Sequence, residues 1–177
     1  MTALVAKRYA KAMFDIAKEK NNVREVEEQL QLVVDSLHQN EDLYTILNHP
    51  KINSEAKKKM LSDIFSKSIY EEVLDFLFIL LEKGRQNLVP QILVEYIALS
   101  DEENNVVRAT VYSAVALDNV QIDLIKVKLS SMFNKSIIIN NKIDVSLIGG
   151  VYIKAADKVI DGSVKGKLKE LQKAMLA

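Results

Sequence analysis

Hydrophobic side chains recur at helical spacing through the first hundred residues of the chain. Small residues form one stripe near the N-terminus, and valines and leucines form a second stripe after residue 22. Apolar positions three and four residues apart lie on one face of an α-helix, so each stripe predicts an amphipathic helix. The spacing predicts six helices. They begin at Thr2, at Asn21 or Asn22, around Leu43, at Asn53 or Ser54, at Ser68 and at about Leu88.

The fourth and fifth predicted helices differ in how polar they are. In the fourth helix, three consecutive lysines at 57–59 are expected to point outward. Its inward positions are expected to be Ala56, Met60, Leu61, Ile64 and Phe65. Ser68 and Glu71 have the spacing of a capping box at the start of the fifth helix, which is apolar nearly all round over residues 73–81. Such a helix is normally the buried centre of a bundle, but where its neighbours leave it uncovered it forms an apolar groove for a partner.

The hydrophobic pattern changes from helical spacing to alternation at Asn104 and Asn105. Residues 106–114 alternate apolar and polar side chains, and residues 137–143 are rich in β-branched side chains, so both stretches are predicted strands. Between them, Asp118 can cap a helix. Its inward positions are expected to be Ile122, Ile125, Leu129, Met132 and Phe133.

Four of the five glycines lie in the last thirty residues or so, between positions 149 and 166. The apolar run at 145–153 predicts a strand with a bulge at its two glycines. Residues 151–155 and 158–161 predict a hairpin that turns at Ala156. Ser163 can cap a final helix, whose apolar positions at helical spacing are Val164, Leu168, Leu171 and Met175.

These elements predict a protein that is mainly α with a small α+β part. Residues 1–105 are expected to form an N-terminal bundle of about six helices, and residues 106–177 a C-terminal α/β-mixed domain. Hydrophobic residues make up 49% of the chain and charged residues 27%, which is typical of an ordered globular protein. The sequence contains no cysteine, which excludes disulfides, thiolate metal sites and cysteine nucleophiles.

The net charge of zero hides an uneven distribution. Residues 1–105 hold 13 Lys and Arg against 18 Asp and Glu, a net charge of −5, and residues 106–177 hold 11 against 6, a net charge of +5. The two parts are therefore expected to face different partners, or partly each other. Solvated helix faces that happen to differ in sign explain the charges about equally well.

No stretch of the sequence predicts a membrane span or a targeting segment. The longest apolar runs, at 76–81 and 145–153, are far shorter than the ~20 residues that cross a bilayer. The N-terminus has no basic region followed by an apolar core, and it enters a helical pattern at once. Neither a signal peptide nor a transit peptide is expected.

The pattern that comes nearest to catalytic chemistry is Gly-Ser-Val-Lys-Gly-Lys at residues 162–167. It departs from a phosphate-binding loop, because the glycine spacing is one residue short and Leu168 replaces the Ser or Thr that binds Mg²⁺. His38 and His49 have no carboxylates spaced around them as a metal site requires. We expect no enzymatic activity, no cofactor and no metal ion.

The basic residues of the final predicted helix allow a second interpretation. Its lysines could contact phosphates, and they are Lys165, Lys167, Lys169 and Lys173. Because no aromatic stacking platform or nucleic-acid-reading motif accompanies them, a solvated face is favoured. A nucleic-acid-binding adaptor that uses the basic C-terminal domain stays as the alternative function.

The glycine-rich C-terminal stretch resembles the signature of the delta subunit of F-type ATP synthases, the oligomycin-sensitivity-conferring protein family. The matching segments are Leu147-Ile-Gly-Gly-Val-Tyr-Ile-Lys154 and Asp157-Lys-Val-Ile-Asp-Gly-Ser-Val-Lys-Gly-Lys-Leu168. The structural positions of this motif are Gly149, Gly150, Asp161, Gly162, Ser163 and Gly166. The alanine-rich residues 6–17 are similar to the start of the same family. Val145 and Ala156 depart from it, because the family often has proline and glycine there.

The resemblance implies a non-catalytic stator subunit that helps to couple proton flow to ATP synthesis. It implies that the N-terminal bundle binds the N-terminal segments of the alpha subunits of the catalytic head. It also implies that the C-terminal domain binds the b subunits of the peripheral stalk. By the same resemblance, one copy would serve each complex at the cytoplasmic face of the cell membrane, with neither a cofactor nor direct membrane insertion.

Two sets of contact residues are expected for these partners. A groove between the first and fifth helices would accept an amphipathic helix of the alpha subunit, with candidate contacts Tyr9, Ala12, Met13, Phe76 and Ile79. Core packing explains Met13 and Phe76 equally well. Candidate contacts to the acidic stalk helices are the basic residues Lys154, Lys165 and Lys169.

Overall fold

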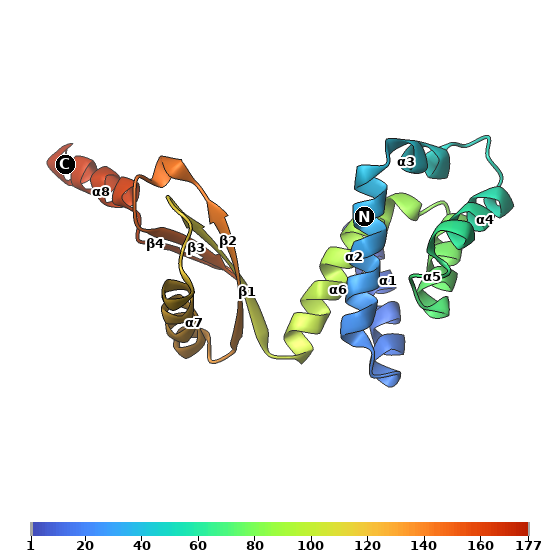
Figure 1. Ribbon diagram of the computed structural model, residues 1–177, viewed down its shortest axis with the longest axis horizontal. Coiled ribbons are helices and arrows are strands. Elements are labelled where there is room, and N and C mark those ends of the chain that lie inside the picture. The colour runs from blue at the N-terminus through green and yellow to red at the C-terminus, as the bar shows by residue number, and fades with distance from the viewer. Residues whose placement is uncertain (1, 177) are drawn as a thin grey trace. The chain divides into compact units, whose positions relative to one another are not determined.

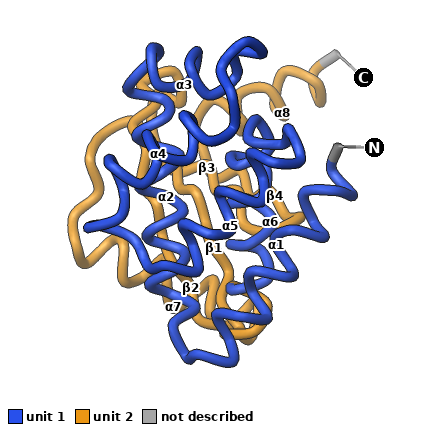
Figure 2. The backbone as a smooth tube through the Cα atoms, turned by 90° about the vertical axis from the view of Figure 1, so that its right-hand side faces the viewer, with its two compact units in different colours: residues 1–100 blue, residues 101–177 orange. Residues whose placement is uncertain are grey.

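The computed structural model describes residues 2–176, and the chain divides into two compact units, residues 1–100 and 101–177. Figure 2 draws the first unit in blue and the second in orange. Unit 1 is a helical bundle, and unit 2 combines a small sheet with two helices. The predicted fold class, mainly α with a small α+β part, is confirmed.

Unit 1 contains the six helices that the sequence predicts (Figure 1). They are α1 (Thr2–Glu19), α2 (Val23–Gln39), α3 (Glu41–Asn48), α4 (Ser54–Phe65), α5 (Glu71–Glu82) and α6 (Val89–Glu103), with a 3₁₀ turn, η1 (Gln86–Leu88), before the last. Pro90 lies in the first turn of α6, where its missing N–H leaves no bond unmade. Helix α6 continues for three residues past the division between the units.

The core of unit 1 follows the apolar stripes of its helices. On α1 the small side chains Ala6, Ala10 and Ala17 are fully buried or nearly so, which lets neighbouring helices approach closely. Tyr96 of α6 is completely buried; its hydroxyl donates a 3.0 Å hydrogen bond to the carbonyl of Val23. The buried polar group at the centre of the bundle is therefore paired.

Two local predictions for unit 1 are wrong. Lys57 was expected on the outer face of α4, yet it is buried, while Ala56 and Ile64 are exposed. The buried stripe of α4 consists of Lys57, Leu61 and Phe65, and a lysine can take such a position because its aliphatic stem packs while its charge reaches water. The inward positions Leu61 and Phe65 are confirmed.

The predicted capping box between Ser68 and Glu71 is also wrong. Helix α5 starts at Glu71, with Tyr70 rather than Ser68 at its N-cap position. The backbone N–H of Ser68 instead donates to the carbonyl of Phe65 at the end of α4. The backbone N–H of Tyr70 donates to Gln29 Oε1 of α2, at 2.7 Å. The start of α5 is thus fastened by a side chain from another helix, which no local pattern reveals.

Unit 2 is built on a four-stranded sheet with the order β2-β1-β3-β4 (Figure 1). Its elements are β1 (Val106–Ser113), α7 (Asn119–Phe133), β2 (Ser136–Ile143), the 3₁₀ turn η2 (Val145–Leu147), β3 (Val151–Ala155), β4 (Lys158–Asp161) and α8 (Val164–Leu176). Strand β1 runs parallel to β2, which requires the α7 crossover, and antiparallel to β3. The predicted hairpin of β3 and β4 is confirmed, with Ala156 at its turn in a left-handed conformation, φ +52°.

Only one face of this sheet is covered. Val107, Ala109 and Val111 of β1 are buried in a core cluster with Leu129 of α7, as the alternating pattern predicts. Asp118 forms a complete capping box with Gln121 at the start of α7. Met132, which was expected inward, is exposed, because the stripe of α7 that packs on the sheet follows Ile125, Leu129 and Phe133 at intervals of four residues.

The predicted bulged strand at 145–153 is wrong at its first half. Residues 145–147 form the turn η2, and the strand begins only at Val151. Asp144 Oδ1 accepts a hydrogen bond from the backbone N–H of Ser146, and Gly150 has φ +75°. A side chain that bonds the backbone two residues on favours a turn over a strand.

Candidate partner-binding surfaces

An aromatic and cationic cluster lies between α1 and α5 on unit 1. The ring of Tyr9 meets the ring of Phe76 edge to face, with 6.1 Å between centroids. Arg85, which follows α5, donates a 3.0 Å hydrogen bond from Nη1 to the Tyr9 hydroxyl. The same guanidinium lies 5.5 Å from the centre of the Tyr9 ring. These contacts hold Tyr9 in a fixed orientation at the surface.

The five residues that the sequence proposes for the alpha subunit fall into two groups. Met13 and Phe76 are buried, with 1% and 7% of their surface exposed, so they support this surface from beneath. Tyr9 is half-buried, while Ala12 and Ile79 are exposed. Ile79, with 47% of its surface exposed, is the large apolar side chain of this set that a partner can cover directly.

A hollow that sequence reasoning missed lies between the start of α1 and α6. It is lined by Ala3, Ala6, Pro90, Gln91, Val94 and Glu95. Val94 is two-thirds exposed, although it sits on a helix whose other side is deep in the core. The small side chains of α1 are the sequence signal for such a hollow, but which helix they face is a tertiary property.

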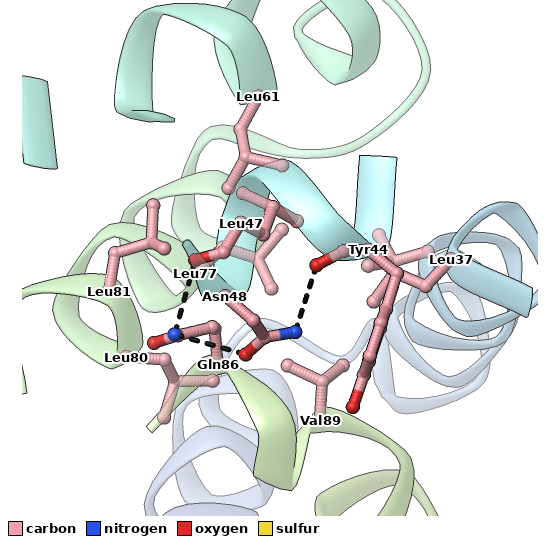
Figure 3. A pocket seen from close by; sticks show the side chains of 11 residues that line it. Leu37, Tyr44, Leu47, Asn48, Leu61, Leu77, Leu80, Leu81, Gln86 and Val89 are labelled. Carbon is pink, nitrogen blue, oxygen red and sulfur yellow. Dashed lines mark hydrogen bonds between the residues drawn. The ribbon is translucent and has the colours of Figure 1, made fainter. Parts of the chain in front are cut away.

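Unit 1 also encloses a small cavity, shown in Figure 3. It measures about 20 Å³ and lies mainly among leucine and valine side chains from the five helices α2 to α6. Gln86 Nε2 donates to the carbonyl of Leu47 and to Asn48 Oδ1, both at 3.2 Å. This volume is about the room that one water molecule needs. The cavity is therefore a packing gap of the bundle and too small for an organic ligand.

In unit 2, the signature residues form an interlocked pair of turns. Ser163, with 1% of its surface exposed, donates from Oγ to Asp161 Oδ1 at 2.6 Å and accepts from the backbone N–H of Gly166 at 3.0 Å. The backbone N–H of Ser163 donates to the same carboxylate oxygen at 2.9 Å. The predicted cap of the final helix by Ser163 is thus confirmed.

The glycines of the signature allow the two turns to touch. A Cβ on Gly150 would lie 2.3 Å from the carbonyl oxygen of Gly162, and one on Gly166 would lie 2.5 Å from Asp161 Oδ2. Two backbone bonds join the same turns, from Val164 to the carbonyl of Gly149 and from Gly162 to the carbonyl of Val151. The motif is therefore a structural lock, which we call the glycine interlock: residues 144–151 held against residues 161–166.

Two carboxylates of the glycine interlock are stabilised in their charged form. Hydrogen bonds from the side chain and backbone of Ser163 lower the pKa of Asp161, and the charge of Lys169 adds to this effect. Hydrogen bonds from Ser146 lower the pKa of Asp144, with a smaller contribution from Lys165. These hydrogen bonds therefore favour the ionised form of both carboxylates.

The turn that the interlock holds contains a strained residue. Ile148 has φ +67° and ψ −41°, although a β-branched side chain strongly disfavours positive φ. A conformation of this kind costs about 1–3 kcal/mol and persists only where its surroundings enforce it. The side chain of Ile148 is two-thirds exposed, so it gains little from packing within unit 2.

The three lysines proposed for the stalk lie on two different elements. Lys154 of β3 is on the uncovered face of the sheet, with Nζ 5.8 Å from the ring centres of both Tyr112 and Tyr152. Lys165 of α8 donates a 3.1 Å hydrogen bond to Ser146 Oγ, beside the interlock. Lys169 is exposed one turn further along α8. The structure therefore places Lys165 and Lys169 together and Lys154 on a different element.

Helix α8 extends from the end of β4 with its apolar stripe uncovered (Figure 1). The exposed side chains of this stripe are Val164, Leu168, Leu171 and Met175. The helical spacing was visible in the sequence, and it normally indicates a face that packs on the core. Here the face is exposed within unit 2, which sequence spacing cannot reveal.

The described residues show no sign of catalytic or metal chemistry. No group of three metal-ligating side chains comes together within residues 2–176. His38 and His49 are both exposed, and His49 Nδ1 accepts a hydrogen bond from the backbone N–H of Lys51. Among the helices of this same stretch, none is long and apolar enough to cross a membrane.

The comparisons with known proteins agree with one another. The family model described as ATP synthase delta (OSCP) subunit matches residues 5–175. The chain is 42% identical to the ATP synthase subunit delta of Alkaliphilus metalliredigens, over 99% of this chain and 98% of the relative. It is 40% identical to the ATP synthase subunit delta of Acetivibrio thermocellus, over 98% of each chain.

A solved structure shares the fold of the whole chain. It is a chain in the cryo-EM structure of the Toxoplasma gondii mitochondrial ATP synthase hexamer, with a TM-score of 0.74 over 97% of both chains and 20% identity. At this identity the likeness shows the fold, while the family model and the close relatives show the family. The protein therefore belongs to the ATP synthase delta (OSCP) subunit family.

Proposed function

We propose that unit 1 binds the alpha subunits of the catalytic head and that unit 2 binds the b subunits of the peripheral stalk. Membership in the family makes the chain a non-catalytic subunit of an F-type ATP synthase. The observation that carries the proposal is the presence of two different exposed surfaces, one on each compact unit. A chain that joins head and stalk in this way keeps the head still while the rotor turns, so that proton flow drives ATP synthesis.

The surface between α1 and α5 suits an amphipathic helix from the alpha subunit. Ile79 and Ala12 offer exposed apolar area, and Tyr9 of the same surface is held in place by Phe76 and Arg85. A fixed aromatic ring beside exposed aliphatic groups is the kind of anchor that concentrates binding energy at interfaces. Helix-in-groove recognition uses such anchors at helical spacing.

The basic side chains of unit 2 suit the acidic helices of the stalk. Lys154, Lys165 and Lys169 are the proposed contacts, and residues 106–177 together carry a net charge of +5. Complementary charge mainly speeds association and selects the partner. In the cell, the complex would lie at the cytoplasmic face of the membrane. The nucleic-acid alternative gains no support from the comparisons.

Two attachments made by one chain serve the mechanical role. A stator must not dissociate during rotation, so slow dissociation matters more than fast association. Once one unit is bound, the other meets its partner at high effective concentration. A flexible joint near Asn104 and Asn105, where the hydrophobic pattern changes from helical spacing to alternation, would let each unit adjust to its own partner.

The test is calorimetric titration of the full chain with a peptide of the N-terminal segment of the same organism's alpha subunit. The wild-type protein is expected to bind one peptide tightly, and Ile79→Asp to weaken binding by about ten-fold or more, as loss of an interface anchor does. The matched control is Ile64→Asp, because Ile64 is 46% exposed on α4 against 47% for Ile79. Equal affinity for both variants and wild type would refute this assignment of the surface.

A further inference from the structure

The strained turn and the bare helix of unit 2 lie next to each other. The backbone N–H of Val164, the first residue of α8, donates to the carbonyl of Gly149 at 3.0 Å. A Cβ on Gly149 would lie 3.3 Å from Val164 Cγ2. Ile148 therefore projects from a turn that is fastened directly to the first turn of α8.

Exposed apolar side chains thus stand both on α8 and on the turn that is fastened to its first residue. We call this set the α8 platform: Ile148, Val164, Leu168 and Leu171. All four are large side chains with 40–67% of their surface exposed. The last three follow each other at intervals of four and three residues, which places them along one face of α8. A contiguous exposed apolar surface of this kind marks an interaction site.

The charges around the α8 platform limit what can cover it. Helix α8 carries four lysines, Lys165, Lys167, Lys169 and Lys173, and a single acidic residue, Glu170. A second copy of this chain would bring the same lysines face to face, and like charges repel across an interface. A partner with an apolar stripe flanked by Asp and Glu is complementary in both respects.

The strain at Ile148 points to the same external partner. Within the chain, glycine would suit the positive φ of this position better, because it carries no Cβ. The isoleucine side chain is two-thirds exposed, so the fold does not need it. Strained residues cluster where a site is pre-organised for a ligand.

We propose that the α8 platform is the docking site for one acidic amphipathic helix, with Ile148 as its fixed apolar anchor. The glycine interlock gives the platform its rigidity, because it holds the Ile148 turn against α8. This inference rests on the proposed function, since the acidic helix is taken to belong to the peripheral stalk. It adds an apolar anchor to a contact that was expected from lysines alone.

The experiment titrates the full-length chain with the purified soluble domain of the organism's own b subunits. Ile148→Gly is the decisive variant, because it removes the side chain while relieving the positive φ. We expect its affinity to fall by about ten-fold or more, as for an interface anchor, with no loss of thermal stability. The matched control is Ala156→Gly, since Ala156 also has positive φ and is exposed at the neighbouring hairpin turn. Its affinity should equal that of the wild type.

A second pair of variants tests the helical part of the platform. Leu171→Asp is expected to weaken binding of the b subunits by about ten-fold or more. Leu124→Asp on α7 is its control, because Leu124 is 58% exposed against 61% for Leu171. Binding by the wild type should also weaken as salt is added, since the platform is flanked by lysines.

The outcomes separate the two proposals. If the wild type binds the b subunits and Ile148→Gly binds equally well, the platform is wrong and the stalk-binding role stands. If the wild type does not bind them at all, the proposed function of unit 2 fails, and the platform with it. If Ile148→Gly and Leu171→Asp instead lose binding to vesicles that contain anionic lipid, while binding of the b subunits is unchanged, the surface faces a membrane and the proposal is overturned.

Discussion

Unit 1 and unit 2 use their hydrophobic residues in opposite ways. In the part of the chain that the structure describes, the core cluster of unit 1 contains 25 buried residues, and 9 large hydrophobic side chains of that unit are exposed. In unit 2 the core cluster contains 7 residues, and 14 large hydrophobic side chains are exposed. Unit 1 is thus held together by burial, whereas in unit 2 exposed large apolar side chains outnumber the residues of the core cluster.

The difference shows what replaces a large core in unit 2. Burial stabilises a domain in proportion to the apolar area removed from water, so seven core residues contribute far less than twenty-five. Unit 2 adds backbone bonds and close glycine contacts between residues 144–151 and 161–166. Its shape therefore depends on a few specific positions, while that of unit 1 is spread over many.

The comparison predicts that a single methyl group added at Gly150 greatly lowers the stability of unit 2. Gly150→Ala is expected to cost about 2–4 kcal/mol of the stability of unit 2, because it combines an unfavourable positive φ with overpacking against a backbone carbonyl. Hydrogen exchange followed by mass spectrometry should show faster exchange throughout residues 144–166 and unchanged exchange in unit 1.

The control for this substitution lies in unit 1. Gly84 also has positive φ, +63°, but a Cβ there would meet nothing within 4 Å. Gly84→Ala should therefore cost about 1–2 kcal/mol, the conformational part alone. An equal loss of stability from both substitutions would mean that the glycine interlock contributes nothing beyond backbone conformation.

Helical and alternating periodicity were enough to predict the helices of both units and the strand β1, but not the turn at residues 145–147. The stripes of α1 and α2 and the alternation of β1 are strong because one face of each is buried. The prediction for Lys57 was wrong because it assumed that lysines point outward. The long aliphatic stem of a lysine can pack in a buried stripe. Periodicity also failed at α8, because an apolar stripe looks the same whether the chain itself or a partner covers it.

The candidate sites were only partly visible in the sequence. The motif identified Gly150, Asp161 and Ser163, and their contacts show why those residue types stand there. Ile148 was read as part of a strand, since β-branched residues favour strands and its positive φ is imposed by the turns on either side. The choice between core packing and partner contact for Met13 could not be made from the sequence, because it depends on which helices pack around α1.

A smaller effect on stability is expected at high pH, and it concerns the buried Tyr96 of unit 1. Burial raises the pKa of Tyr96 above its ordinary value of 10.0, so the stability it contributes is complete below that pH and is lost as the unfolded chain ionises above it. Tyr96→Phe should cost about 1 kcal/mol at neutral pH through the lost hydrogen bond to Val23. The difference in the free energy of unfolding between wild type and Tyr96→Phe should become smaller above pH 10, as measured by denaturant unfolding. If this difference in unfolding free energy stayed constant with pH, the raised pKa of the buried Tyr96 would be contradicted.

The smallest effect is expected in acid and concerns the glycine interlock. Hydrogen bonds from Ser163 hold the pKa of Asp161 below its ordinary value of 3.8. The stabilisation is therefore complete above that pH and is lost as the pH falls through the lower pKa of the folded state. Because the carboxylate is exposed to solvent, we expect local loosening without unfolding, seen by NMR as faster amide exchange at Ser163 and Gly166. Asp161→Asn keeps an acceptor oxygen without the titration, while Asp144 still titrates in the other segment of the interlock. The variant should thus lose the acid response of these two amides, and an unchanged response would assign it to Asp144 instead.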